Sequence, residues 1–202
     1  MKRCLLPCLV AALALCGCTT ERQSNPDRTA TEQLLISTAA ERAATKLALQ
    51  MPTGTKVFVD ATNFDGVDAK YAIAAIRAHL LEHGSLLVDD KAKAENIVEI
   101  RAGALSMDQN ALLIGIPQMT LPIPLAGQAV TPEIALFKRD RRLGLAKFAA
   151  VGYNVADGKL VASSAPEYGD SYETHWLVLL LFGWTTSDVG PDDDPDHPPP
   201  AN

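Results

Sequence analysis

Cysteine is almost absent from this 202-residue chain outside its first segment. The four cysteines stand at positions 4, 8, 16 and 18, and none follows. The chain beyond residue 18 therefore cannot form a disulfide, supply a cysteine nucleophile or offer a thiolate ligand to a metal. A domain built from it must be held together by its apolar core.

Long apolar runs and an excess of positive charge are missing as well. No stretch of the sequence reaches the ~20 consecutive apolar residues that a membrane-spanning helix needs. The 18 basic and 24 acidic residues give a net charge of −6. This balance excludes a general nucleic-acid binder, because such proteins need a cationic surface.

Recognisable catalytic motifs are also lacking. The sequence contains no G-x-S-x-G, no P-loop and no G-x-G-x-x-G, and no pair of acidic residues stands out as an acid and a base. Members of a catalytic triad can lie far apart, so this absence alone does not exclude an enzyme. We nevertheless predict that the protein is not an enzyme and carries no cofactor and no metal.

One motif keeps a zinc hydrolase as the least favoured alternative. His79, Glu82 and His83 match H-x-x-E-H, which places two imidazoles on one face of a helix. The pattern is short and stands at the end of a predicted helix, where histidine is favoured by the helix dipole. Only His175 and His197 remain as further histidines. A solvated helix terminus is the preferred interpretation.

The first 17 residues have the organisation of a signal peptide. Lys2 and Arg3 form a positive start, and residues 5–15 form an apolar run interrupted only by Pro7. This run has the length of the apolar region of a signal peptide and is too short to span a membrane.

The run ends in Leu15-Cys16-Gly17-Cys18. This sequence resembles the lipobox of bacterial lipoproteins, in which a leucine and two small residues precede an obligatory cysteine. The resemblance implies that residues 1–17 are removed and that the Cys18 thiol is acylated. Cys16 departs from the usual alanine or serine but is small enough to fit. Thr19, in place of aspartate, implies sorting to the outer membrane of a Gram-negative cell, with the protein body on the periplasmic face.

We predict three regions in the mature chain. Residues 18–28 are polar and form a short tether. Residues 29–189 form a single domain. Residues 190–202 contain five prolines and four aspartates and no large apolar side chain, which predicts a disordered acidic tail.

The domain begins with a helix–strand–helix–strand pattern. A helix is predicted over residues 30–50, starting with a capping box formed by Thr29 and Glu32. A strand over 56–60, a helix over 67–83 and a strand over 85–88 then form a strand–helix–strand unit with apolar strands.

The remainder favours β-structure. A strand is predicted over 96–107, ending in a turn at 108–110. A meander of three strands is predicted across 133–164, with one turn within 136–142 and an Asp-Gly turn at 156–158.

These elements predict an α+β fold, with a mainly antiparallel sheet of five or six strands and two helices packed on one face. The layout is similar to that of lipoproteins of envelope assembly and secretion, such as the curli-secretion channel family and the lipopolysaccharide-assembly lipoprotein. The lipobox is the only diagnostic motif behind this similarity.

Two uncharged apolar segments are candidate interaction surfaces. Residues 111–125 contain three prolines, which exclude a regular helix and a central strand and predict a loop. Residues 175–184 place a tryptophan at each end of an apolar run and predict a strand with two apolar faces. Either segment is part of the core, an interface with another chain or a membrane contact. The candidate contact residues are Ile114, Ile116, Met119, Leu121, Ile123, Trp176 and Trp184.

One basic cluster follows the first of these segments. It contains Lys138, Arg139, Arg141 and Arg142. A solvated hairpin turn is the preferred interpretation, and contact with anionic lipid headgroups or an acidic partner is the alternative.

Taken together, the sequence predicts a non-enzymatic outer-membrane lipoprotein that acts in envelope assembly or interaction through apolar surfaces. Its predicted partners are the membrane, through acyl chains on Cys18, and a protein partner or further copies of itself. A carrier of lipid or glycolipid is the alternative, and it would require an enclosed apolar cavity.

Overall fold

The computed structural model describes residues 28–123 and 127–190. The predicted signal peptide, Cys18, nearly all of the tether and the tail from residue 191 therefore lie outside the described residues.

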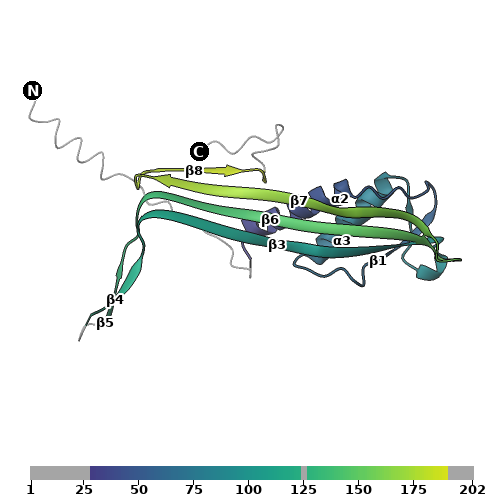
Figure 1. Ribbon diagram of the computed structural model, residues 1–202, viewed down its shortest axis with the longest axis horizontal. Coiled ribbons are helices and arrows are strands. Elements are labelled where there is room, and N and C mark those ends of the chain that lie inside the picture. Colours follow the sequence, from purple (N-terminus) through teal and green to yellow (C-terminus); the bar gives the residue numbers. More distant parts are fainter. Residues whose placement is uncertain (1–27, 124–126, 191–202) are drawn as a thin grey trace, which may run out of the picture.

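The described chain folds into a six-stranded sheet, two helices and a separate two-stranded sheet (Figure 1). The strand order of the large sheet is β2-β1-β3-β6-β7-β8. The helices are α2 (Ala30–Lys46) and α3 (Ala69–Glu82), and η1 (Lys91–Lys93) is a short 3-10 turn. The strands of the large sheet are β1 (Lys56–Asp60), β2 (Leu86–Leu87), β3 (Asn96–Ile116), β6 (Ile134–Asn154), β7 (Leu160–Val178) and β8 (Phe182–Ser187).

This arrangement confirms the α+β class and the six strands, but the expected mainly antiparallel sheet is wrong. The sheet is mixed, because β1 lies parallel to both β2 and β3, whereas β3, β6, β7 and β8 are antiparallel neighbours. α3 crosses over between β1 and β2, and the segment containing η1 crosses over between β2 and β3, so all three strands run in the same direction. The predicted strand–helix–strand unit is therefore confirmed.

Local sequence signals explain where both helices begin and end. At the start of α2 the Glu32 amide donates to the Thr29 hydroxyl, and the Thr29 amide donates to the Glu32 carboxylate, which is the predicted capping box. The helix stops at Lys46, earlier than the predicted residue 50. α3 ends next to Gly84, whose φ of 84° suits the left-handed position after a helix.

Helix α2 lies directly against β6 and β7. Ser171 donates a hydrogen bond of 2.6 Å from its hydroxyl to the Leu35 carbonyl of α2. A Cβ atom added at Gly169 would lie 2.0 Å from the Ala39 carbonyl oxygen, and one at Gly144 would lie 2.5 Å from the Leu35 carbonyl oxygen. The close approach of helix and sheet therefore depends on residues that have little or no side chain.

The hydrophobic core lies beneath the two helices. Alanines line the inner side of α2, and bulky side chains of α3, β1, β3 and β6 fill the space around them. The largest fully buried side chains include Leu35, Val57, Ile76, Val98 and Phe148.

Three strands are much longer than predicted. β3 and β6 each contain 21 residues and β7 contains 19. The turn predicted at 108–110 is wrong, because Asp108, Gln109 and Asn110 pair with β6 in the middle of β3. The turn predicted within 136–142 is also wrong, because β6 is continuous there, so 133–164 holds two strands and not a three-stranded meander. The Asp-Gly turn at 156–158 is confirmed between β6 and β7.

Beyond Gly144 and Ser171 the long strands continue past the helices (Figure 1). We call this part the extended end; it comprises residues 109–116 of β3, 134–142 of β6, 173–178 of β7 and all of β8. From its tip the chain leaves as a hairpin of β4 (Met119–Ile123) and β5 (Gly127–Thr131). No helix in the described ranges is long and apolar enough to cross a membrane.

Candidate functional site

The extended end brings together the two apolar segments that the sequence marks as interaction surfaces. Ile114 of β3 pairs with Phe137 of β6, Phe137 pairs with Val178 of β7, and Val178 pairs with Phe182 of β8. Residues from 111–125 and from 175–184 therefore lie in one continuous piece of sheet, although they are far apart in sequence.

Both segments differ in conformation from the predictions. Residues 111–123 are not a loop, because they include the end of β3 and all of β4, and residues 124–125 lie outside the described residues. Pro122 is tolerated in β4 because a strand of a two-stranded sheet is always an edge strand. Residues 175–184 are not one strand, because the chain turns back at 179–181 between β7 and β8.

The apolar side chains at this end are exposed. Leu181, at the turn, has 82% of its surface accessible, and its neighbours are at least half exposed. No charged residue occurs between Asp108 and Glu133. We call the exposed apolar group the apolar tip; it consists of Ile114, Ile116, Ile134, Leu136, Leu179, Leu180, Leu181 and Phe182.

The hairpin β4–β5 adds further apolar surface next to the tip. Met119 and Leu121 of β4 and Val130 of β5 are exposed. Ile123 belongs to β4, and its side chain lies outside what the structure describes. An apolar surface of this extent on a helix-free part of the molecule is typical of a contact with another molecule.

Along β7 and β8, the two tryptophans lie two residues from the level of Phe182 in the tip. Trp176 and Trp184 pair across β7 and β8, and their rings stack with centroids 6.0 Å apart. Phe137 meets the edge of the Trp176 ring, also at 6.0 Å. The Trp176 indole N–H donates to the Thr186 hydroxyl. The aromatic side chains thus form one cluster on a single face of the sheet.

The basic cluster is not a hairpin turn, because all four residues lie in the continuous strand β6. Strand alternation sends their side chains to opposite faces. Arg139 lies over the Trp176 ring and Arg141 over the Tyr172 ring, each 6.0 Å from the ring centroid. These two arginines and the tryptophans therefore share one face.

Lys138 and Arg142 lie on the other face, where acidic neighbours balance them. Lys138 forms an ion pair of 2.7 Å with Glu133, and Arg142 one of 3.5 Å with Glu173. The Nε of Arg142, like that of Arg139, is buried without a hydrogen-bond partner within the described chain. The four basic residues do not form one cationic patch.

Polar side chains on this second face bond to one another. The Gln109 amide donates to Asp140 at 2.9 Å. The His175 ring contacts the Glu173 carboxylate at 2.7 Å and the Thr185 hydroxyl at 2.8 Å. The two faces of the extended end therefore differ: one is aromatic and cationic, and the other is a hydrogen-bonded polar surface.

The turn at the tip places leucines in a backbone conformation that leucine rarely adopts. Leu179 and Leu180 have φ values of 51° and 66°, and the Leu181 amide donates to the Val178 carbonyl. Asn-Gly is the pair that suits two consecutive positive φ angles in a hairpin. Each leucine in this conformation costs ~1–2 kcal/mol. Sequence reasoning missed this turn because the leucines favour a continuous strand.

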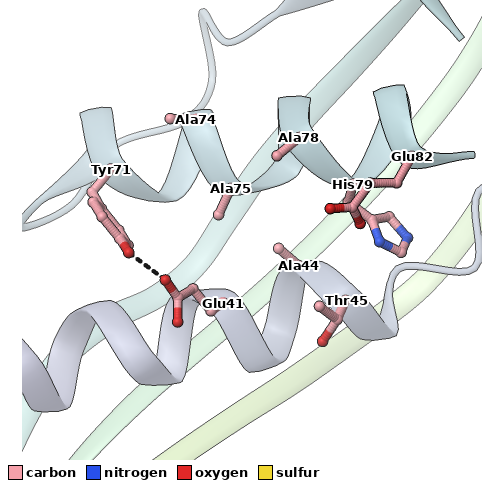
Figure 2. A pocket seen from close by; sticks show the side chains of 9 residues that line it. All are labelled: Glu41, Ala44, Thr45, Tyr71, Ala74, Ala75, Ala78, His79 and Glu82. Carbon is pink, nitrogen blue, oxygen red and sulfur yellow. Dashed lines mark hydrogen bonds between the residues drawn. The ribbon is translucent and has the colours of Figure 1, made fainter. Parts of the chain in front are cut away.

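A groove of about 430 Å³ separates the two helices (Figure 2). Four of its nine lining residues are alanines, at positions 44, 74, 75 and 78. At one end the Tyr71 hydroxyl donates to the Glu41 carboxylate, and this bond, with burial and the negative charge, raises the pKa of Tyr71.

Two residues of the H-x-x-E-H motif, His79 and Glu82, lie at the other end of this groove (Figure 2), and both histidines of the motif contact backbone carbonyls. The Nε2 of His79 bonds to the Leu47 carbonyl at 3.0 Å, and the Nδ1 of His83 to the His79 carbonyl at 2.8 Å. Within the described residues no three His, Cys, Asp or Glu side chains are grouped as a metal site would require. The two histidines thus have a structural explanation at the end of α3.

A family model matches residues 12–179 of the chain; it describes a family of unknown function, DUF6655. No curated protein matches the chain.

Proposed function

Because the chain belongs to the DUF6655 family of unknown function, we propose its role from its own residues. It is a non-enzymatic component of the bacterial envelope, anchored to the outer membrane by acylated Cys18, and it acts in assembly or interaction. The extended end is the part that makes the contacts.

One observation carries this proposal. The two uncharged segments of the sequence converge at the end of the sheet that the helices leave uncovered, and their large side chains are exposed there. Exposing them to water without a partner is unfavourable by ~25 cal/mol for each Å² of apolar surface. Contact with another molecule removes this cost.

We also propose that both helices cover a single face of the sheet. Buried side chains of α2 and α3 share one cluster with Val57, Val98 and Phe148 of the sheet. The extended end would then be the only long part of the sheet that is accessible from both sides.

The shape of the groove between α2 and α3 favours a protein that acts through surface contacts over a lipid carrier. The groove between α2 and α3 is partly open to solvent, and Glu41 and Glu82 line it (Figure 2), whereas a carrier needs an enclosed apolar cavity. A zinc hydrolase would need His79 and His83 released from their backbone partners and a third ligand.

Unpaired strand edges make a second copy of the chain a fitting protein partner. Within the described residues, β8 has a neighbour only in β7, and β3 beyond Glu99 has one only in β6. These two edges run in opposite directions, so β8 of one copy continues the antiparallel pattern against β3 of the next. β8 contains no charge and no proline, the residues that usually protect an edge.

Cysteine crosslinking in the outer-membrane fraction tests this contact. Thr185→Cys is combined in turn with Gln109→Cys, Ala111→Cys or Leu113→Cys, which share its face of the sheet. Within one copy these positions lie three strand spacings apart, ~14 Å, too far for a disulfide. Any disulfide therefore joins two copies, and we expect dimers and larger adducts from at least one pair.

The matched control carries cysteines at Leu81 and Leu160, which are exposed away from the extended end. The acylated thiol of Cys18 does not compete. Absence of adducts from all three pairs, or equal adducts from the control pair, would show that the edges do not bind one another.

A further inference from the structure

We infer that the apolar tip enters the lipid leaflet that holds the acyl chains of Cys18, so that a bilayer with anionic headgroups is the partner of this surface. This inference rests on the proposed lipid anchor and names what the tip contacts. The edge pairing of β3 and β8 uses other atoms and is independent of it.

On the face that carries the tryptophans, the order of side chains along the extended end matches the layers of a membrane surface. Arg141 comes first, then a row with Arg139, Trp176 and Trp184, and then the apolar tip. Arginine is attracted to anionic headgroups, tryptophan favours the interface, and leucine and phenylalanine favour hydrocarbon. On the face of the tryptophans, the nearest acidic residue of the long strands is Asp108. It pairs with Leu143, two residues farther from the tip than Arg141. On the other face, Lys138 and Glu133 form an ion pair beside the tip.

The tip has the depth of one leaflet. Leu180 at the turn is four positions along the chain from Trp176 and four from Trp184. At ~3.3 Å per residue the tip reaches ~13 Å beyond the tryptophans. Half of the ~30 Å hydrocarbon core is ~15 Å, so the tip enters one leaflet and does not cross the membrane.

The anchor and the tip can reach the same leaflet. Leu35 of α2 lies at Gly144, seven residues from Phe137 along β6, which is ~23 Å at ~3.3 Å per residue. α2 runs away from the tip, since Leu35 lies at Ser171 and Lys46 reaches Tyr168, so its first residue is nearer still. Arg28 is ten positions after Cys18 in the sequence, and a chain of this length extends to ~33–36 Å at most.

The turn at Leu179 and Leu180 supports the same partner. Two leucines occupy positions where asparagine and glycine would relieve the backbone strain. Apolar side chains at the turn between β7 and β8 stabilise insertion into lipid, whereas in water they stabilise nothing.

Intrinsic fluorescence tests the inference, because Trp176 and Trp184 are the two tryptophans of the chain. The lipidated full protein is reconstituted into vesicles of phosphatidylethanolamine and phosphatidylglycerol that contain acyl-brominated phospholipid. We expect blue-shifted emission, strong quenching by the brominated lipid and little quenching by iodide.

The variant L179N/L180G separates binding from folding. Its turn is less strained, so we expect its melting temperature to rise by roughly 4 °C, while quenching by the brominated lipid falls to less than half. A second variant, L181N/F182T, removes apolar surface without changing the strained pair and should lose quenching as well. Leu160→Asn, an exposed leucine at the opposite end of β7, should leave quenching unchanged.

The charge of the lipid is tested with R139Q/R141Q. It should weaken quenching in anionic vesicles and leave it unchanged in vesicles of phosphatidylethanolamine and phosphatidylcholine.

The outcomes distinguish this inference from the proposed function. If the anchored wild type shows iodide-accessible tryptophans and no quenching by the brominated lipid, the tip does not enter lipid. If the tryptophans are shielded equally in lipid-free crosslinked oligomers, protein covers the tip and the lipid inference is wrong, while the proposed function stands. If palmitate labelling is equal in wild type and Cys18→Ser, the anchor itself is wrong.

Discussion

At the scale of single residues, small side chains decide where α2 can lie. Gly144, Gly169 and Ser171 face the backbone of α2, and the Ser171 hydroxyl bonds to the Leu35 carbonyl. Their own side chains are too small to hold the helix away from β6 and β7, so the alanine side of α2 reaches the sheet directly.

Gly169→Ala is therefore expected to destabilise the protein. Its added methyl group would lie 2.0 Å from the Ala39 carbonyl oxygen and 2.5 Å from the Ala43 amide nitrogen. Overpacking of this kind costs ~1–3 kcal/mol or more, which urea unfolding of the two proteins would measure. Gly103→Ala is the control, because its nearest atom belongs to the flexible Lys147 side chain; an equal loss there would contradict the explanation.

At the scale of elements, the sequence predicted the first half of the domain well. The Thr29 capping box, the strand Lys56–Asp60 and the helix ended by Gly84 depend on local signals, and these agree with the structure. The long strands could not be predicted from local signals. Polar residues 108–110 have turn propensity, but pairing with β6 overrides it.

For the candidate site as well, local sequence signals predicted part of the result and long-range strand pairing determined the rest. Hydrophobicity alone identified residues 111–125 and 175–184, and their exposure agrees with an interaction surface. Their meeting at one end depends on long-range pairing through β6, which carries no local signal. The separation of Arg139 and Arg141 from Lys138 and Arg142 follows from strand alternation, but the sequence interpretation placed them in a turn.

The start of α3 provides a prediction about pH. Arg28 hydrogen bonds to the Asp68 carboxylate, which precedes α3, and these bonds, with the positive charge, hold the pKa of Asp68 below its ordinary value against a smaller opposing effect of burial. A lowered pKa contributes stability above the unfolded value of ~3.9, and this stability is lost as the pH falls through the folded value.

Asp68→Asn should therefore lower the melting temperature at pH 7 and lower it by less at pH 2.5. Both partners are about one third exposed, so the loss at pH 7 is at most ~1 kcal/mol. Asparagine also tolerates the left-handed backbone of Asp68, φ 61°. Thermal unfolding monitored by circular dichroism at the two pH values gives the comparison; an undiminished difference at pH 2.5 would exclude the ion pair as its cause.

At the scale of the whole molecule, the domain has two dissimilar halves (Figure 1). One half contains the helices and the core, and the other is a helix-free sheet with exposed apolar and aromatic side chains. Apart from the acyl chains on Cys18, every proposed contact with lipid and with other copies lies in the second half. The alanine-lined groove between α2 and α3 has no part in these contacts.

Hydrogen–deuterium exchange of the lipidated protein tests this central claim most directly. The protein in outer-membrane vesicles is compared with the same protein dispersed as monomers in detergent. We predict that exchange slows in the vesicles over 105–116 and 175–187, at the β3 edge, the tip and β8, and is unchanged in α2 and α3. Protection confined to the two helices, with unchanged exchange at the extended end, would contradict the account.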